Sequence, residues 1–467
     1  MDSIFVPHPE SVLATAQPFG QITVRDDRRR MESPAARSAS IWSRASTWGL
    51  LLSLLYFALD GVSPFFNSPT ALRAVGTVSE GGVLGERLVK LCMFVLCMIF
   101  VAQRHQAVRR LSMQMKLLTS FPMLALLLFP VSQLASRTIS SGALLLAGIL
   151  LVYYIMSRYA FDEVLELFLI LGTGTIVASI VFALALPQYG LDLMGGHSGA
   201  WKGVFSAKNH LGNMALFFMT MAVSYRGRTL FLRSVRISQI IFCLIAIAFS
   251  RAATAYLLTA VYIVYFEAMK TLNRFRTKDC FVLCIVLLGA LSIAAVMIMA
   301  TPDLLFSLVG KDASLTGRTG IWSAVIDSIA KRPLLGYGYQ AFWLALEGES
   351  YRVILVVSWV LAQAQSGFLD VMLEMGAVGL TIVALVFGFA FRDGVVCLLR
   401  SRDQTQLRAV EWYLAIVMLT LIYNLDESFL FEPKHLGSMI FVIACVGLKQ
   451  EWLRLRVTAA APAPGAH

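Results

Sequence analysis

The sequence contains few charged residues for its length. Asp, Glu, Lys and Arg make up 14% of the 467 residues, whereas soluble domains contain about a quarter. Apolar residues make up 58%, and runs of about 20 of them, enough to cross a hydrocarbon core of roughly 30 Å, recur along the chain. This composition predicts an all-α, polytopic helical membrane protein. The net charge of +11 is therefore not taken as a nucleic-acid footprint, and no nucleic-acid partner is expected.

Motifs for nucleotide and metal binding are also missing. No Gly-rich loop ends in Lys-Ser or Lys-Thr, and no His-Glu-x-x-His pattern occurs. We therefore expect no cofactor and no metal. The seven cysteines form no Cys-x-x-Cys pair, so disulfides and a zinc site are not expected. Asp60 and Glu166 are the main ionisable residues deep in apolar runs, and so few argue against a proton-coupled transporter.

We expect about twelve transmembrane helices and one large extracytoplasmic loop. Residues 1–45 should form a disordered basic N-terminal tail, residues 46–450 the transmembrane domain, and residues 451–467 a C-terminal tail. The expected spans are about 48–66, 88–103, 117–135, 141–157, 163–187, 211–225, 237–250, 252–269, 280–300, 367–391, 411–425 and 436–449.

Basic residues mark alternate connections between these spans. Four Lys or Arg residues occur in each of the segments 104–116, 226–236, 270–278 and 392–408. The positive-inside rule places these segments in the cytoplasm, together with both termini. The segments left on the extracytoplasmic side are 67–87, 188–210, 301–366 and 426–435.

The longest extracytoplasmic segment, residues 301–366, contains the polar stretch GRTGIWSAVIDSIAKRPLLGYGY. Apolar side chains between residues 321 and 329 recur at helical spacing, which predicts a short amphipathic helix. Lys331 and Arg332 follow at its C-terminal end, where cations suit the helix dipole. The PLLGYGY sequence then predicts a helix stop and a tight turn. The alternative is an interfacial helix with snorkelling cations.

Further polar residues occur at span ends on the same side. WKGVFSAKNHLGNM (201–214) offers Lys208, Asn209 and His210, with ordinary interfacial polarity as the alternative. Arg251 lies between two apolar runs with almost no loop between them. It is either a snorkelling end residue or a site residue that faces the bundle interior.

Acidic residues occur at two further span ends. Asp370 and Glu374 are four positions apart and so share one helix face, where they need a partner or water. Helix packing is the alternative explanation for this segment. YNLDESFLFEPKH (423–435) adds Glu427 at a span exit.

Basic residues thus gather on one face without a metal motif. Such a face suits an anionic lipid-linked substrate, such as a polyprenyl diphosphate that carries a sugar. Transfer of the sugar builds charge on the diphosphate, and fixed guanidinium groups can stabilise that charge as a metal would.

Four segments resemble motifs of the O-antigen ligase and Wzy-type polymerase superfamily, which includes exopolysaccharide polymerases of the ExoQ type. GRTGIWSAVIDSIAKRPLLGYGYQAFW resembles the signature of the family's loop, and GVFSAKNHLG its Lys-Asn-x-x-Gly segment. SRAATAY is similar to its Ser-Arg-x-x-Thr segment, and NLDESFL to its Asn-x-x-Glu-Ser element. The ordered matches run from about residue 200 to residue 430.

The resemblance implies inverting, metal-independent glycosyl transfer from a polyprenyl-diphosphate-linked glycan. The family's essential arginines fall on Arg251 and Arg318. Its proposed general-base histidine falls on Gln365, whose amide cannot take a proton at neutral pH. Asp370 is the nearest replacement base in sequence, with His210 and Glu427 as candidates from other segments. The predicted substrate-binding residues are Lys208, Asn209, His210, Trp322, Lys331, Arg332, Tyr337 and Glu427.

The function expected from the resemblance is polymerisation of lipid-linked repeat units into an exopolysaccharide at the bacterial inner membrane. The alternatives are an O-antigen-type ligase and, from a different class, a non-enzymatic transporter of lipid-linked glycans. The expected partners are the polyprenyl-diphosphate-linked oligosaccharide and membrane lipid. A flippase and chain-length or export proteins are further candidates.

Overall fold

The computed structural model describes residues 45–60, 84–192, 199–275, 318–344, 347–357, 361–401 and 403–460. The chain divides into two units, residues 1–50 and 51–467, and only residues 45–50 of the first are described. In chain order the elements are α2 (Ala45–Ala58), α4 (Leu84–Gln103), α5 (His105–Gln114), α6 (Lys116–Leu127), η4 (Phe129–Val131), α7 (Ala135–Arg158), α8 (Phe161–Ala185), α9 (Pro187–Gly190), β1 (Leu191–Asp192), β2 (Ala200–Trp201), α10 (Lys208–Ser224), α11 (Leu230–Ser250), α12 (Ala253–Phe275), α15 (Arg318–Lys331), α16 (Gly348–Val357), α17 (Gly367–Arg400), α18 (Gln404–Asp426) and α19 (Leu436–Ala460).

Helices dominate because a chain in lipid must satisfy its backbone polar groups within each segment. Among the described residues, six helices are long and apolar enough to cross a membrane: α7, α8, α11, α17, α18 and α19. The pair α4 and α5, bent by 95°, would make a seventh. The prediction of an all-α, multi-pass membrane protein is therefore confirmed. The only strands described are the two-residue β1 and β2, which pair antiparallel.

The count of twelve spans stays a prediction. Eleven of the expected spans overlap a helix, and the remaining one, at 280–300, lies outside the described residues. Several helices extend beyond the expected edges, and the longest extensions are at the ends of α17 and α19. α17 continues to Arg400, and α19 continues to Ala460, so residues 451–460 of the expected C-terminal tail are helical.

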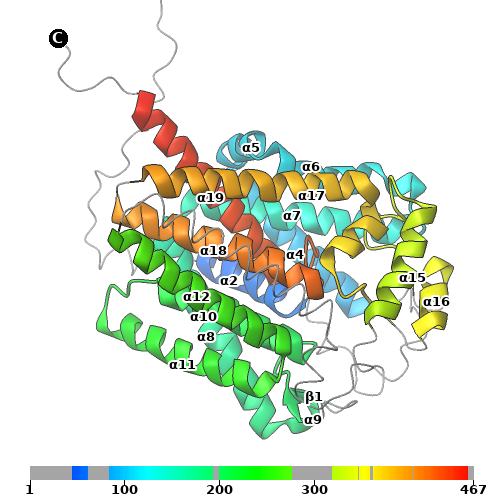
Figure 1. The fold of residues 1–467 in the computed structure, drawn as a ribbon, viewed down its shortest axis with the longest axis horizontal. Helices are drawn as coiled ribbons and strands as arrows, with labels where there is room; N and C mark the ends of the chain where they lie inside the picture. Colours follow the sequence, from blue (N-terminus) through cyan, green and yellow to red (C-terminus); the bar gives the residue numbers. More distant parts are fainter. Residues whose placement is uncertain are drawn as a thin grey trace, which may run out of the picture. The chain divides into compact units, whose positions relative to one another are not determined.

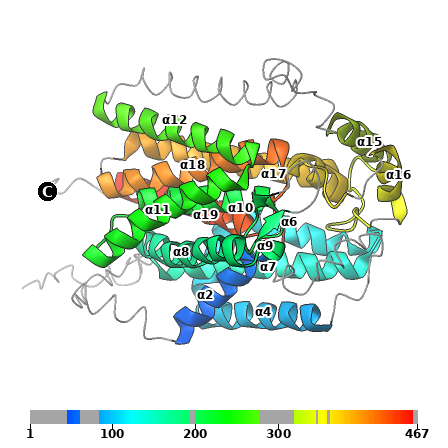
Figure 2. The same ribbon diagram turned by 90° about the horizontal axis from the view of Figure 1, so that it is seen from below.

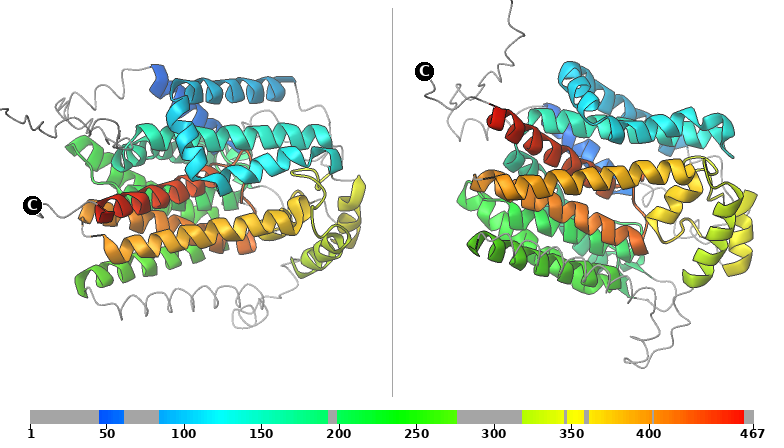
Figure 3. Two further views of the ribbon diagram at one scale, coloured as in Figure 1. Left: turned by 90° about the horizontal axis from the view of Figure 1, so that it is seen from above. Right: turned by 45° about the horizontal axis from the view of Figure 1, so that its top comes forward.

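The helices pack side by side in the second unit. α10 packs along α11 and α8, while α17, α18 and α19 pack against one another. Figures 1 and 2 show α8, α10, α11, α12 and α18 running alongside each other. In every view α15 and α16 lie at one end of the bundle, and the last turns of α19 lie at the other (Figure 3).

Arg408 connects three helix ends that the charge pattern places on the cytoplasmic side. Arg408, at the start of α18, lies 2.8 Å from a carboxylate oxygen of Asp162, at the start of α8. Its guanidinium also donates to the carbonyl of Ser224, at the end of α10, at 2.9 Å. Three helix ends that the charge pattern places on one side are thus tied together.

The loop expected at 301–366 has a small core of its own where it is described. Ile321, Val325 and Ile329 of α15 are buried, and they pack with residues of α16 and of the segment after α15. Their spacing of four residues places them on one helix face. The amphipathic helix expected within residues 321–329 is therefore present, as α15.

The PLLGYGY turn inserts into a break in α17. Gly376 has φ +62° and interrupts the helix, which leaves the carbonyls of Leu373 and Glu374 without their usual helical donors. The backbone N–H groups of Tyr337 and Gly338 donate to these carbonyls at 2.7 and 3.0 Å. Gly336 also has a positive φ, and a Cβ there would lie 2.5 Å from the Leu373 carbonyl oxygen. The turn therefore requires glycine, and it fixes the segment that follows against α17.

Candidate functional site

A cavity of about 490 Å³ lies where expected extracytoplasmic segments meet. Its lining comes from Asp60 after α2, from Phe121 of α6 and Arg137 of α7, from residues between 206 and 210, from residues 339–343, from residues 362–374 and from residues 423–435. Three of the four segments that the charge pattern places outside the cytoplasm therefore contribute to one cavity. The fourth, residues 67–87, lies mostly outside the described part of the chain.

Close packing at a glycine sets α10 against the junction of α11 and α12. A Cβ on Gly212 would lie 2.7 Å from the Ala255 side chain and 2.8 Å from the Ser250 hydroxyl. Arg251 sits in this junction as the left-handed C-cap of α11, with φ +50° and an exposed side chain. Its charge is near enough to act on Lys208, the first residue of α10.

The segments that resemble family motifs are joined by hydrogen bonds between their side chains. Asn209 donates to Glu427, and the hydroxyl of Thr254 donates to Asp426 at 2.7 Å. Ser428 donates to Asp370 at 2.6 Å. The Lys-Asn, Ser-Arg-x-x-Thr and Asn-x-x-Glu-Ser segments and the start of α17 thus form one connected network at the cavity.

Asp370 lines the cavity, and its carboxylate accepts hydrogen bonds from three residues. Trp343 Nε1 donates to Oδ1 at 2.8 Å, the Ala364 N–H donates to both oxygens at 3.0 and 3.1 Å, and Ser428 donates to Oδ2. The carboxylate therefore clamps two loop segments to α17. Its predicted role as the base remains a proposal, and this geometry adds a positioning role.

A second pair of carboxylates lies beside Asp370. The amide nitrogen of Gln340 donates to Glu374 at 3.3 Å and to Glu432 at 2.8 Å. Glu432 lies in the connection between α18 and α19, where burial raises the pKa of its carboxyl to about 7. The Gln340 hydrogen bond and the charge of Lys434 oppose this rise in pKa, whereas Asp60 and Asp370 add to it.

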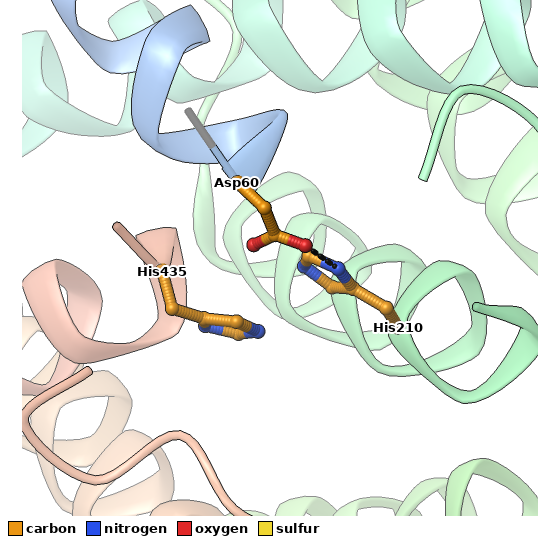
Figure 4. A group of neighbouring side chains, drawn as sticks. All are labelled: Asp60, His210 and His435. Carbon is orange, nitrogen blue, oxygen red and sulfur yellow. Dashed lines mark ion pairs between the residues drawn. The ribbon is translucent and has the colours of Figure 1, made fainter. Parts of the chain in front are cut away.

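Asp60, His210 and His435 form a third polar group in the cavity wall (Figure 4). Asp60 Oδ2 lies 2.7 Å from His210 Nδ1, and Ser206 donates to the same oxygen at 2.9 Å. The His435 ring stacks on the His210 ring with centroids 4.4 Å apart. Burial lowers the pKa of His435 to about 3, with the His210 charge adding to this shift. The Gly437 N–H donates to Nδ1 of His435, and a ring nitrogen accepts only in the neutral ring.

These three residues offer atoms of the kind that bind metals, all within 4.8 Å of one another. The in-plane lone pairs of two stacked rings, however, lie in separate and nearly parallel planes, so they do not converge readily on one ion. Nδ1 of each ring is also engaged, one with Asp60 and the other with the Gly437 N–H at 2.9 Å. The arrangement suits a hydrogen-bonded pair better than an ion, and the expected absence of a metal stays a prediction.

The predicted site residues fall into two groups. Asn209, His210, Gln365, Asp370 and Glu427 line the cavity. Lys208 lies beside its wall, three residues before the expected span 211–225. Burial lowers the pKa of Lys208, Asp192 and Glu427 oppose this, and Arg251 adds to it.

The remaining predicted residues do not line the cavity. Trp322 donates to the Ala364 carbonyl at 3.2 Å, and Tyr337 donates to the Ser328 carbonyl at 2.8 Å. Their contacts hold the loop in place.

The three basic residues predicted in this loop also lie away from the cavity lining. Lys331 pairs with Glu349, and the Arg332 guanidinium lies 5.0 Å from the centre of the Tyr337 ring. Arg318 begins α15, and only its backbone position is described. The described contacts of Lys331 and Arg332 are therefore made away from the cavity, and the binding role of all three residues stays a prediction.

Sequence analysis did not assign several cavity residues. Gln340, Trp343, Glu432 and His435 all line it, and none stood out by spacing. Asp60 did carry a signal, because an ionisable residue inside an apolar run commonly marks a functional position.

Comparison with known proteins bears on the same part of the chain. Residues 238–384 match the family model described as O-Antigen ligase. The resemblance to the O-antigen ligase family is confirmed. The chain is also 25% identical over 272 residues to the exopolysaccharide production protein ExoQ of Rhizobium meliloti (strain 1021). That match covers 56% of this chain and 61% of ExoQ. The family match spans Arg251, Arg318 and Asp370, but it ends before the Asn-x-x-Glu-Ser element.

Proposed function

We propose that the protein joins polyprenyl-diphosphate-linked oligosaccharide repeat units into an exopolysaccharide. Transfer would be inverting and metal-independent, on the extracytoplasmic face of the inner membrane, with both termini in the cytoplasm. Its similarity to an exopolysaccharide production protein and its O-antigen ligase segment support glycan transfer as the reaction class.

The observation that carries the proposal is an excess of carboxylates over cations at the cavity. Two cations, Arg137 and Lys434, line it together with five carboxylates, those of Asp60, Asp370, Glu374, Glu427 and Glu432. Carboxylates and amides line the cavity, including Glu374, Glu427, Gln340 and Gln365. Such groups accept and donate hydrogen bonds to sugar hydroxyls, whereas several carboxylates together repel a diphosphate. Lys208 and Arg251 lie close together beside this wall. The sugar would therefore occupy the cavity, and the diphosphate would lie against the cations at its edge.

This division suits glycosyl transfer because charge develops on the departing diphosphate. Arg251, and Arg318 from the loop, would stabilise that charge with hydrogen bonds that strengthen as the bond breaks. The transfer needs a second sugar hydroxyl as the acceptor, which the lining of the same cavity can orient.

A ligase is the second candidate, favoured by the family description of residues 238–384. Deletion of the gene followed by analysis of lipid-linked and secreted glycans separates the two. A polymerase predicts that single repeat units accumulate on the lipid carrier. A ligase predicts full-length chains left on that carrier. Unchanged glycans of both kinds would contradict both functions, and loss of lipid-linked units from the outer face would instead favour a transporter.

A further inference from the structure

Two buried polar atoms in the cavity wall lack a hydrogen-bond partner, and both belong to one pair of residues. Among the cavity-lining side chains that the structure describes, these atoms are Oδ1 of Asp60 and Nε2 of His210. Buried polar groups are nearly always hydrogen-bonded, so such atoms call for an explanation. A bound substrate hydroxyl would supply the missing partner.

The contact with Asp60 determines which nitrogen of His210 is free to accept. A carboxylate only accepts hydrogen bonds, so Nδ1 of His210, 2.7 Å from Asp60 Oδ2, carries the hydrogen. In the neutral ring Nε2 then presents its lone pair. Figure 4 shows the Asp60 carboxylate facing the His210 ring, with His435 alongside. Asp60 reaches this position from the end of α2, and His210 from the first turn of α10.

Apart from Asp60, the carboxylates that line the cavity accept hydrogen bonds from protein donors, and Glu427 accepts one from Asn209. Asp370 already accepts from Trp343, Ala364 and Ser428. Glu374 and Glu432 share the amide of Gln340. Each of these carboxylates already accepts at least one hydrogen bond from a protein donor, whereas the buried Nε2 of His210 has no partner in the protein.

His435 is suited to a different task from His210. Its Nδ1 accepts the Gly437 N–H at 2.9 Å, so the neutral ring carries its hydrogen on Nε2 and cannot accept there. Its ring is stacked between Phe429 and His210, with the Phe429 centroid 4.9 Å away and the two planes within 2°. His435 therefore supports the His210 ring by packing.

We propose that His210 is the catalytic base of the transfer and that Asp60 is its positioning residue. This inference rests on the proposed glycosyl transfer. The acceptor hydroxyl gives its proton to His210 Nε2 while its oxygen bonds to the anomeric carbon of the donor sugar. The bond from that carbon to the diphosphate oxygen breaks, and the electron pair leaves with the diphosphate. Asp60 stabilises the imidazolium, which later returns its proton to the released diphosphate or to water.

The inference predicts a large and specific kinetic effect. A general base contributes roughly 10²–10⁴-fold to the rate, so His210→Ala should lower chain growth by that factor. Asp60→Asn should lower kcat with little change in KM, because Asp60 does not touch the substrate. The two residues act as one unit, so Asp60→Asn should cost little when His210 is already Ala.

The test uses the full-length protein in liposomes with a synthetic polyprenyl-diphosphate-linked oligosaccharide as both donor and acceptor. Imidazole and substituted imidazoles are added to His210→Ala, and chain growth is measured. A base role predicts recovered activity that depends on the pKa of the added base. A structural role predicts either no recovery or recovery that is indifferent to that pKa. His435→Ala is the matched control, and any loss there should not be restored by the added bases.

The outcomes separate the inference from the function on which it rests. Wild-type protein that forms no glycosidic bond contradicts the proposed function. Wild-type protein that elongates the glycan, together with His210→Ala at a similar rate, overturns the inference alone. If His210→Ala does not fold, His210→Gln decides, because the amide can still donate to Asp60 but cannot take a proton. Normal elongation by that variant would equally overturn the assignment.

Discussion

The two ends of the helix bundle are both rich in polar residues, but they use them differently. At the end expected in the cytoplasm, the buried carboxylate of Asp393 is met by Arg392 at 2.6 Å and by Lys449 at 3.5 Å. Lys449 and Arg456 also lie 3.9 and 4.1 Å from the centre of the Trp452 ring. At the cavity end, five carboxylates and two histidines line the cavity with only two cations, Arg137 and Lys434. Two acceptor atoms of this lining have no hydrogen-bond partner.

The comparison teaches that polarity alone does not indicate a site. Where cations meet carboxylates and aromatic rings, the charges satisfy one another and contribute mainly to packing and orientation. A buried group that lines a cavity and is not fully hydrogen-bonded can take its missing partner from a ligand. The predictions below test whether the two ends differ in this way.

The largest effect is expected from the arginine at the cavity edge. Arg251→Ala should lower chain growth at least ~100-fold, because a donor to the developing charge is lost. Arg251→Lys should also be impaired, since lysine lacks the planar fork that binds two oxygens at once. Arg456→Ala, at the other end, is the matched control and should elongate the glycan normally. The measurement is the rate of chain growth per folded protein.

Two results would break this part of the comparison. Near-normal polymer from Arg251→Ala would return Arg251 to a snorkelling role at the membrane surface. Equal losses from Arg251→Ala and Arg456→Ala would mean that the two ends do not differ.

Arg318→Ala extends the test to the loop, where the same loss of at least ~100-fold in chain growth is expected.

The next effect concerns the Asp370 clamp. Asp370→Asn places an amide donor among three donors and should cost about 1–3 kcal/mol in the free energy of unfolding. Ser428→Ala removes one of the three and should cost about 1 kcal/mol. Chain growth should fall together with thermal stability in detergent. A normally stable Asp370→Asn that makes no polymer would instead support Asp370 as the base, and Gln365→Ala is then expected to be only mildly impaired.

A smaller effect is expected from Glu432 as the pH changes. Burial raises the pKa of its carboxyl from 4.5 to about 7 in the folded state. The folded state therefore binds this proton more tightly than the unfolded state, so its contribution to stability is present below about pH 4.5 and is lost as pH rises through about 7. Glu432→Gln should abolish this loss. The lowered pKa of His435 makes stability rise with pH, and it does so equally in the wild type and in the variant. The difference between their unfolding temperatures therefore isolates the effect of Glu432.

The measurement is thermal unfolding of both proteins in detergent at about pH 4.5 and about pH 8. The stability of Glu432→Gln relative to wild type should rise with pH. A difference that does not change with pH would mean that the pKa of Glu432 is not raised, and that the carboxylate is paired or hydrated.

No effect at all is expected from metal removal. Exhaustive chelation should leave transfer unchanged, because Arg251 and Arg318 would stabilise the diphosphate and the Asp60–His210 contact is a hydrogen bond. Abolition by EDTA with recovery on addition of magnesium or manganese would contradict this and would direct attention to Asp60, His210 and His435.

The helices were predictable from the sequence because their signals are local. Apolar runs predict spans wherever they occur, and the spacing of the apolar residues Ile321, Trp322, Val325, Ile326 and Ile329 predicted α15. Of these five, Ile321, Val325 and Ile329 are buried, Trp322 is partly buried and Ile326 is exposed. The glycines of PLLGYGY predicted a turn as well. The sequence did not indicate that this turn would enter a break in α17, because the break depends on Gly376, about 40 residues away, and on backbone groups that carry no sequence signal.

The site was predictable only in part, for the same reason. Asn209, Asp370 and Glu427 lie in segments with recognisable motifs, and the fold brings them together. Asp60 and His210 are 150 positions apart, and His435 lies 225 positions further along the chain. Nothing local to any of the three indicates that they meet. Long-range packing also directs Trp322 and Tyr337 into hydrogen bonds within the loop rather than toward the cavity.

The most direct test of the account is chain growth by the purified protein alone. The protein would be reconstituted in liposomes with a defined polyprenyl-diphosphate-linked oligosaccharide, and the lipid-linked products followed by mass spectrometry. The account predicts products that grow by whole repeat units, with one polyprenyl diphosphate released for each bond formed, and no growth with Arg251→Ala. A donor that stays unchanged with folded wild-type protein, or that only moves across the bilayer, would contradict it.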